Sequence, residues 1–127
     1  MVTKNKIVHH HLLFQAKVGV LIGENDGARL EKFLHEFLDV IDMKCLISPR
    51  LAFSHQAAWT GIMGIVTSHI AFHYWTKERY LQLDIYSCRT FDQEKAIRYI
   101  RAFWDTRDER YLLIDRETGK DFEIRRR

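Results

Sequence analysis

Apolar and polar residues alternate with a period of two along several stretches of this chain, which is the pattern of β-strands that bury one face. The clearest case is residues 80–87, where Leu81, Leu83 and Ile85 alternate with Gln82 and Asp84. This pattern, together with short apolar runs, predicts strands at residues 6–18, 44–47, 60–66, 68–75, 80–87, 110–115 and 122–124.

Three strand boundaries depend on local signals. The strand at 44–47 is expected to end before Pro49, because proline lacks the amide hydrogen that a central ladder needs, and residues 49–59 are expected to be irregular. Almost no turn signal follows residue 66, so a tight bend or bulge is predicted near Thr67. Residues 116–120 are predicted to form a turn.

Two other segments carry apolar residues at spacings of three and four, which predicts amphipathic helices. Asn25 or Asp26 is placed to cap the first helix, and Thr90 to Gln93 fit a capping box for the second. The apolar faces consist of Leu30, Phe33, Leu34, Phe37, Leu38 and Ile41 in the first helix, and Ala96, Ile97, Ile100, Phe103 and Trp104 in the second.

This order of elements predicts an α+β fold, a two-layer sandwich with a largely antiparallel sheet and the two helices on one face. At 127 residues, the chain is expected to form a single domain, 1–127, with a hydrophobic core. Its apolar content of 46% and charged content of 29% are typical of a globular protein.

The composition also limits which cellular compartment and which binding partners we expect. No apolar run approaches the ~20 residues of a membrane-spanning helix, and the first residues do not resemble a secretory signal, so we predict a cytoplasmic protein without a membrane partner. Two cysteines are too few for a disulfide framework. The net charge of +3 is modest, and the basic run 125–127 is expected to be solvated rather than to bind nucleic acid.

Candidate chemistry concentrates between residues 67 and 88. On a strand, His69 and His73 would share one face and Ser68 would lie on the other, and Cys88 follows His73 by fifteen residues. Such a group can be a catalytic nucleophile with its partner residues, the ligands of a metal ion, or a coincidence. A zinc site fits poorly, because His69, His73 and Cys88 lack a fourth close ligand. A serine hydrolase also fits poorly, because no strand–turn–helix elbow surrounds Ser68.

The run 9–11 is a second candidate metal site. In a strand only His9 and His11 could share a metal, and neither an acidic residue nor a cysteine is close to them in sequence. We therefore expect no metal site in this run.

Several short sequences and their spacings resemble the S-adenosylmethionine decarboxylase family in its small prokaryotic form. The distances from the serine to the histidine and from the histidine to the cysteine match without a gap. His11-Leu12-Leu13 and the first helix also resemble the family's opening segment. The matching residues are Thr60-Gly61, Ser68-His69, His73-Tyr74-Trp75, Tyr80, Asp84 and Ser87-Cys88.

The resemblance implies a proenzyme that cuts itself between Thr67 and Ser68 and thereby converts Ser68 into a pyruvoyl group. That cofactor would form a Schiff base with a small-molecule amine substrate and act as an electron sink. His73 would assist processing, as would Thr60, which replaces a serine of the family. Cys88 would donate a proton to the substrate. The family's small forms are homodimers with sites at the subunit contact, so a homodimer is expected here.

The departures from the family pattern leave the substrate open. Thr67 stands where the family has glutamate, Lys77 replaces the glutamate that holds the ribose hydroxyls, and Arg89 replaces a glycine. Trp75, Lys77 and Glu78 are the expected substrate-binding residues. Besides decarboxylation of S-adenosylmethionine in polyamine (spermidine) synthesis, two alternatives remain. One is the same chemistry on an amino acid such as ornithine or arginine, and the other is an uncleaved regulatory relative.

Overall fold

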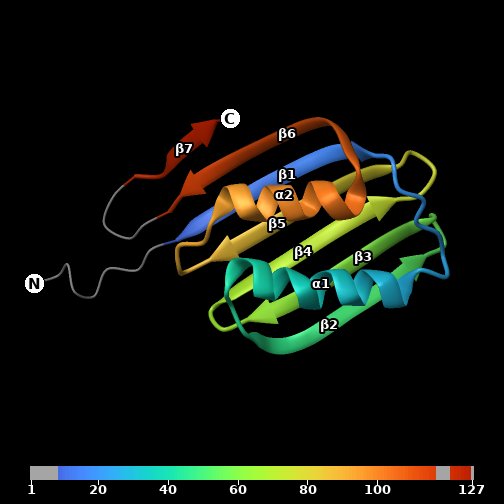
Figure 1. Ribbon diagram of the computed structural model, residues 1–127, viewed down its shortest axis with the longest axis horizontal. Coiled ribbons are helices and arrows are strands. Elements are labelled where there is room, and N and C mark those ends of the chain that lie inside the picture. The colour runs from blue at the N-terminus through green and yellow to red at the C-terminus, as the bar shows by residue number, and fades with distance from the viewer. Residues whose placement is uncertain (1–8, 117–120, 127) are drawn as a thin grey trace, which may run out of the picture.

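The computed structural model describes residues 9–116 and 121–126. Every pair of neighbouring strands in its seven-stranded sheet is antiparallel, and the spatial order is β2-β3-β4-β5-β1-β6-β7 (Figure 1). The elements are β1 (His10–Val18), α1 (Gly27–Ile41), β2 (Cys45–Ser54), β3 (Ala58–Ile65), β4 (Ser68–Trp75), β5 (Tyr80–Ser87), α2 (Gln93–Trp104), β6 (Thr106–Asp115) and β7 (Glu123–Arg126).

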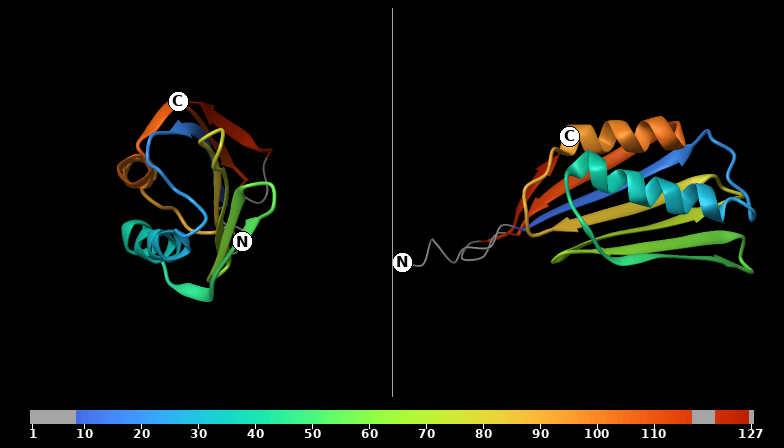
Figure 2. Two further views of the ribbon diagram at one scale, coloured as in Figure 1. Left: turned by 90° about the vertical axis from the view of Figure 1, so that its right-hand side faces the viewer. Right: turned by 60° about the horizontal axis from the view of Figure 1, so that its bottom comes forward.

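Both helices lie on the same face of the sheet, and no other element of the described chain covers the opposite face, which we call the open face (Figure 2). The alternation of the strands explains this arrangement. In β1, Leu12, Phe14, Ala16 and Val18 are buried toward the helices, whereas Lys17 is exposed. The predicted α+β two-layer sandwich is therefore confirmed, with both helices on one face of the sheet (Figure 2).

Aromatic rings form the centre of the core between the layers. Phe33 of α1 makes edge-to-face contacts with Phe72 of β4 and Trp104 of α2, with ring centroids 6.2 and 5.7 Å apart. A Cβ atom at Gly61 in β3 would overlap the Phe72 ring. Glycine at this position therefore leaves room for that ring.

The prediction that the second strand ends before Pro49 was wrong, as was the irregular segment 49–59. β2 continues through Pro49 to Ser54, and β3 begins at Ala58. The pairing with β3 shifts register between Ile47 and Arg50, so Pro49 lies at an irregularity of an edge strand. At such a position the missing amide hydrogen removes no central ladder bond, which is why the strand tolerates the proline.

The helix caps differ in detail from the predictions. Asp92, rather than Thr90, caps α2, and its Oδ1 accepts from Lys95 N at 3.0 Å. Asp26 is the N-cap residue of α1, as predicted, but its side chain makes no capping hydrogen bond to the helix.

Three other strand boundaries differ from the predictions. β6 begins at Thr106 rather than Arg110, β7 spans Glu123–Arg126, and β1 begins at His10. Residues 6–8 of the first predicted strand and residues 117–120 of the predicted turn lie outside the described residues.

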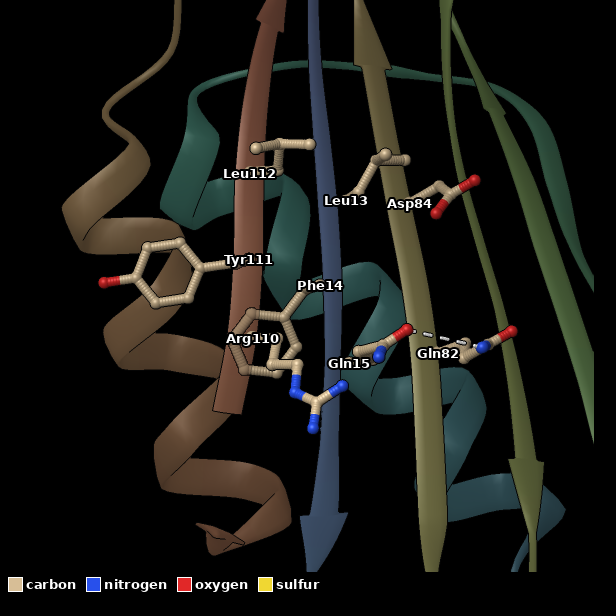
Figure 3. Close-up of a pocket in the computed structure, with 8 residues that line it drawn as sticks. All are labelled: Leu13, Phe14, Gln15, Gln82, Asp84, Arg110, Tyr111 and Leu112. Atoms are coloured by element: carbon tan, nitrogen blue, oxygen red, sulfur yellow. Dashed lines mark hydrogen bonds between the residues drawn. The ribbon is translucent and has the colours of Figure 1, made fainter. Parts of the chain in front are cut away.

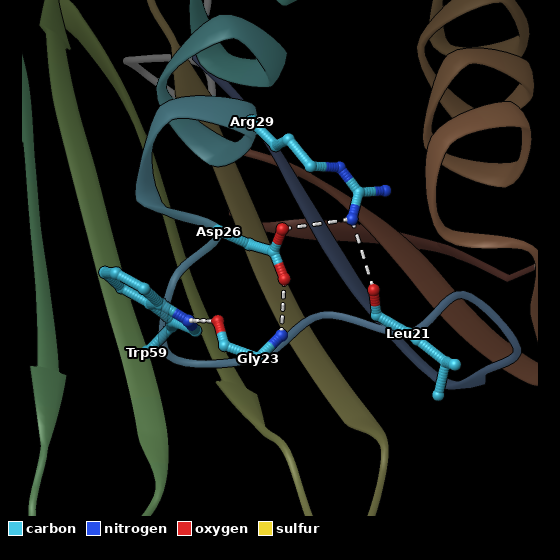
Figure 4. Close-up of polar contacts among 5 residues, drawn as sticks. All are labelled: Leu21, Gly23, Asp26, Arg29 and Trp59. Carbon is cyan, nitrogen blue, oxygen red and sulfur yellow. Dashed lines mark hydrogen bonds and ion pairs between the residues drawn. The ribbon is translucent and has the colours of Figure 1, made fainter.

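The loop before α1 is fixed by Asp26 and by the Trp59 indole (Figure 4). Asp26 Oδ2 accepts from Gly23 N at 2.7 Å, and this hydrogen bond lowers the pKa of Asp26. Trp59 Nε1 of β3 donates to Gly23 O at 2.9 Å. Arg29 Nη1 donates to both Asp26 and Leu21 O at 3.2 Å. The start of α1 is thereby tied to β3.

Replacing Trp59 with phenylalanine is expected to lower the free energy of unfolding by about 1 to 3 kcal/mol, because the buried side chain loses its bond to Gly23 O and some volume. Urea unfolding followed by circular dichroism measures this loss. Trp75→Phe, on the open face, is the matched control and should change the midpoint less. Equal midpoints for Trp59→Phe and the unaltered protein would contradict the anchoring role of Trp59.

Candidate active site

The alternation of β4 separates the candidate residues onto two faces, as predicted. Ser68 is buried toward the helices, whereas His69 and His73 are exposed on the open face. Ser68 is the first residue of the strand, and it pairs with Ile65 at the end of β3. Only residues 66 and 67 join the two strands, so the predicted tight bend near Thr67 is confirmed.

The Ser68 hydroxyl is held by the end of β5. Cys88 N donates to Ser68 Oγ at 3.2 Å, and Ser68 Oγ donates to Ser87 Oγ at 3.5 Å. Ser87 is fully buried and in turn donates to Arg89 O at 2.6 Å. Sequence reasoning matched Ser87 to the family pattern but gave it no role. Its alternation with Ile85 would have placed it on the same face as Ser68.

Thr67 has an unusual backbone conformation, with a φ of 55°. In this left-handed region the Cβ of an L-residue crowds the carbonyl oxygen that follows, which costs roughly 1–2 kcal/mol, and a β-branched residue is seldom found there. The conformation directs the side chain back along the turn. Thr67 Oγ1 donates to Val66 O at 2.7 Å and also contacts Cys88 Sγ. The thiol therefore lies directly beside the Thr67–Ser68 peptide bond.

A hollow of about 540 Å³ opens next to this turn. It lies between the end of α1, the start of β2 and the β3–β4 turn, and it contains side chains of both charge signs. Its lining residues are Leu38, Asp39, Asp42, Met43, Lys44, Ile65, Val66, Thr67 and Arg89. A charged ligand of moderate size in this hollow would lie against Thr67, the residue before Ser68.

Thr60 and His73 form a second group on the open face. They are direct partners in the β3–β4 ladder, and Thr60 Oγ1 lies 3.0 Å from His73 Nδ1. His73 is five residues beyond Ser68 on the same strand, which corresponds to roughly 16 Å along it. The odd spacing also places the two side chains on opposite faces. Within one chain, His73 is therefore far from the Ser68 hydroxyl.

The expected substrate-binding residues extend this second group. Trp75 ends β4, with its ring centroid 6.1 Å from that of His73. Lys77 and Glu78 are exposed in the turn that follows. Trp75 and Glu78 line an open hollow with Lys17 and Tyr80, and Lys77 is not among its lining residues.

The structure thus brings Thr67, Ser68 and Cys88 together at one end of β4. It brings Thr60, His73 and Trp75 together near the other end. It does not bring these two groups into contact within a single chain. Their roles in processing and substrate binding stay predictions.

The open face also contains a polar aromatic cluster, which we call the Tyr86 cluster, comprising His9, His11, His69, Asp84, Tyr86 and Arg116. Tyr86 Oη lies 2.8 Å from His9 Nδ1, and its ring stacks on His69 at 5.2 Å. The Arg116 guanidinium lies 5.2 Å from the centroid of the same ring. Burial, followed by the influence of His11, lowers the pKa of His69, which favours the neutral imidazole.

The Tyr86 cluster changes the interpretation of the histidine run. His9 bonds to Tyr86, while His11 Nδ1 lies 3.3 Å from Arg116 Nη1 and its Nε2 lies 3.8 Å from Asp84. Sequence reasoning missed Tyr86 and Arg116, although the alternation of β5 signals that Tyr86 faces away from the helices. Among the described residues, no group of three or more His, Cys, Asp or Glu side chains is arranged to hold a metal ion.

Over β5, β1 and β6, the open face is slightly hollowed, with a volume of about 390 Å³ (Figure 3). Gln82 Nε2 donates to Gln15 Oε1 across β5 and β1 at 3.5 Å. Asp84, Arg110 and Leu112 complete the open-face rim that the figure shows. The open face is thus a mixed surface of amides, charges and apolar side chains.

Fold and site together define a two-layer α+β protein in which a buried serine hydroxyl is bonded by the backbone of a cysteine, and the thiol of that cysteine contacts the threonine before the serine, at the turn between β3 and β4. The model of the family described as S-adenosylmethionine decarboxylase matches residues 23–117, which is more than half of the chain. The chain belongs to this family. None of the helices in the described part of the chain is long and apolar enough to cross a membrane.

The relatives found by sequence are proenzymes, and each match is partial. The S-adenosylmethionine decarboxylase proenzyme of Thermococcus onnurineus is 47% identical over 45 residues, which are 32% of this chain and 32% of the relative. The corresponding proenzyme of Clostridium botulinum is 33% identical over 48 residues, 37% of this chain and 41% of the relative. The chain therefore matches only about a third to two fifths of the length of these relatives.

Among solved structures, the chain is similar to the crystal structure of the adenosylmethionine decarboxylase from Aquifex aeolicus. The TM-score is 0.69, and the match covers 84% of this chain and 88% of that chain. At 19% sequence identity, this likeness shows the fold alone.

Proposed function

We propose that this chain is a pyruvoyl-dependent decarboxylase that is made as a proenzyme and cuts itself between Thr67 and Ser68. The observation that carries the proposal is the buried Ser68 hydroxyl, which Cys88 N holds beside a peptide bond in a strained turn. Family membership and the proenzyme names of the relatives support it.

Self-cleavage needs only groups of the chain itself and water. Ser68 Oγ attacks the Thr67 carbonyl carbon, the C–N bond breaks, and the Thr67 acyl group moves onto oxygen as an ester. Elimination then releases Thr67 as a carboxylate, and addition of water with loss of ammonia leaves a ketone at position 68. The residues present suit this origin of the cofactor, because the hydroxyl is enclosed and the Cys88 amide hydrogen donates to its oxygen.

A pyruvoyl group supplies a carbonyl that condenses with the substrate amine and accepts the electron pair released with CO₂. The surrounding residues then orient the substrate and return a proton to its carbon atom. Cys88 is the proton donor in this proposal, because its thiol lies against Thr67 and next to Ser68.

The active protein in this proposal is a homodimer whose open faces pack together. Residues Ile47 and Ile62 on that side are 60% and 50% exposed, and apolar surface of this kind favours association. A two-fold axis would bring Thr60 and His73 of one copy to the strand end that carries Ser68 in the other, because these groups lie near opposite ends of β4. Ser68 is the first residue of β4 and its side chain faces the helices, so it would have to turn at the strand end to meet them. Such a dimer would let His73 assist the processing that it cannot reach within its own chain.

S-Adenosylmethionine is the proposed substrate, with Trp75 and Glu78 contributing to its binding. The place of the reaction would be the cytoplasm, in the synthesis of polyamines such as spermidine. The test is release of CO₂ from carboxyl-labelled S-adenosylmethionine by the purified protein, with identification of the decarboxylated product by mass spectrometry. A protein that is cut at Thr67–Ser68 but releases no CO₂ from this compound would exclude it as the substrate.

A second candidate substrate class is a basic amino acid such as ornithine or arginine. The hollow beside Thr67 favours it, since Asp39 and Asp42 could receive a side-chain cation and Arg89 or Lys44 a carboxylate. No aromatic ring on which adenine could stack is among the side chains that line this hollow. This alternative uses the same chemistry at position 68.

For a basic amino acid, replacing both Asp39 and Asp42 with asparagine is expected to raise KM roughly 10-fold or more, because two charge-assisted hydrogen bonds are weakened. Steady-state CO₂ release with ornithine, arginine and S-adenosylmethionine measures this effect. Glu36→Gln on the same helix is the matched control, and its KM should not change. If only S-adenosylmethionine is turned over, and the double variant leaves its KM unchanged, the amino-acid alternative is excluded.

A further inference from the structure

Thr67 and Cys88 are connected through both main chain and side chain. Thr67 Oγ1 contacts Cys88 Sγ, and Cys88 N donates to the hydroxyl of the neighbouring Ser68. The left-handed backbone of Thr67, with a φ of 55°, directs its side chain to the thiol. Cys88 itself is half-buried at the end of β5. In the uncut chain, the turn therefore places these two residues side by side.

The direction of the hydrogen bond follows from the number of hydrogens available. A threonine hydroxyl has one hydrogen and two lone pairs. That hydrogen is donated to Val66 O at 2.7 Å, which leaves only lone pairs for Cys88. The contact between Thr67 Oγ1 and Cys88 Sγ is then an S–H···O hydrogen bond, in which the sulfur carries the proton and donates it.

We infer that Thr67 is a positioning residue for Cys88: its hydroxyl accepts the S–H bond and keeps a protonated thiol aimed at position 68. This inference rests on the proposed function, because a protonated thiol beside position 68 matters only if that position receives a substrate carbon. It gives residue 67 a role in addition to its place on the N-terminal side of the bond that is cut. It also explains how a hydroxyl residue serves at a position where glutamate is the family's pattern.

A spectroscopic measurement on uncut protein tests the contact itself. Every variant carries Ser68→Ala, which prevents cleavage, and Cys45→Ser, which leaves Cys88 as the one thiol. Thr67→Val is nearly isosteric and removes the acceptor, whereas Thr67→Ser keeps the hydroxyl. The infrared S–H stretching band is expected to move to higher frequency in Thr67→Val and to return in Thr67→Ser. A band at the same frequency in all three proteins would overturn the inference.

A kinetic measurement on cut protein tests the consequence. With Cys45 and Ser68 intact, Thr67→Val is expected to lower kcat per cleaved chain by roughly two- to tenfold, the equilibrium factor of one hydrogen bond, with little change in KM. Thr67→Ser should restore kcat. A structural role alone would alter folding or the extent of cleavage instead, so an unchanged kcat in Thr67→Val would overturn the positioning role.

The two measurements also separate this inference from the proposed function. If the unaltered protein is never cut, the proposed function fails, while the infrared band still reports whether the S–H···O bond exists. If the protein is cut and active but the band does not move, only the inference about Thr67 fails.

Discussion

Replacing Ser68 with alanine is expected to leave one full-length chain, whereas the unaltered protein separates into two chains covering residues 1–67 and 68–127. The reason is that the proposed cleavage begins with attack by Ser68 Oγ on the preceding carbonyl, and alanine has no oxygen to attack with. The expected effect is complete loss of cleavage rather than a reduced rate. Intact mass spectrometry of the purified proteins measures it, and the second chain should have the mass of a pyruvoyl terminus in place of serine.

Ser54→Ala is the matched control for this experiment. Like Ser68, Ser54 lies beside a tight turn, here as the last residue of β2, and its hydroxyl accepts from Gln56 N at 3.2 Å. Cleavage in this variant should equal that of the unaltered protein. If the unaltered protein itself stays whole, both decarboxylase hypotheses, with S-adenosylmethionine or with a basic amino acid as substrate, fail. The uncleaved relative, which binds or regulates a partner subunit, would then be favoured.

The sequence predicted the layers of the fold well, because burial on one face imposes a strict period of two on a strand. β4 illustrates this, since the separation of Ser68 from His69 and His73 follows directly from alternation. β2 illustrates the limit. Pro49 signals the end of a central strand, but the sequence does not reveal that this strand is an edge where a register shift accommodates proline.

The composition of the candidate site was only partly predictable. The matched spacing identified Ser68, Cys88, Thr60 and His73, but spacing along the chain carries no information on the conformation of a single residue. The positive φ of Thr67 depends on how two residues close the β3–β4 turn, and it decides that the hydroxyl meets the thiol. The Tyr86 cluster depends on which strands become neighbours, since β1, β4, β5 and the segment after β6 contribute to it.

The odd spacing between Ser68 and His73 has a consequence for assembly. Five residues along a strand reverse the face and span roughly 16 Å, so no side-chain movement joins these two groups within a chain. If both act in one reaction, they must come from two copies. The proposed homodimer then contains two composite sites, each with Ser68 and Cys88 from one copy and Thr60 and His73 from the other.

Two inactive variants are therefore expected to restore activity when they are produced together. Ser68→Ala lacks the cofactor precursor, and His73→Ala lacks the group that assists processing, so each homodimer should be inactive or nearly so. In a mixed dimer, one site receives Ser68 from the His73→Ala copy and His73 from the Ser68→Ala copy. With random pairing of equal amounts, about a quarter of all sites are intact, so about a quarter of the unaltered activity should return.

Co-expression with two different affinity tags, followed by tandem purification, isolates the mixed dimer. Cleavage and CO₂ release per dimer are then measured, and about half of the unaltered activity is expected because one of the two sites is intact. As a control, Ser68→Ala is paired with Cys88→Ala. In this mixed dimer, the intact Cys88 belongs to the copy that lacks Ser68. Within one chain, Cys88 N contacts Ser68 Oγ at 3.2 Å. If the two residues act within one chain, the mixed dimer should therefore stay inactive. Restoration in the control pair, or none in the Ser68→Ala and His73→Ala pair, would contradict this division of the site between the subunits.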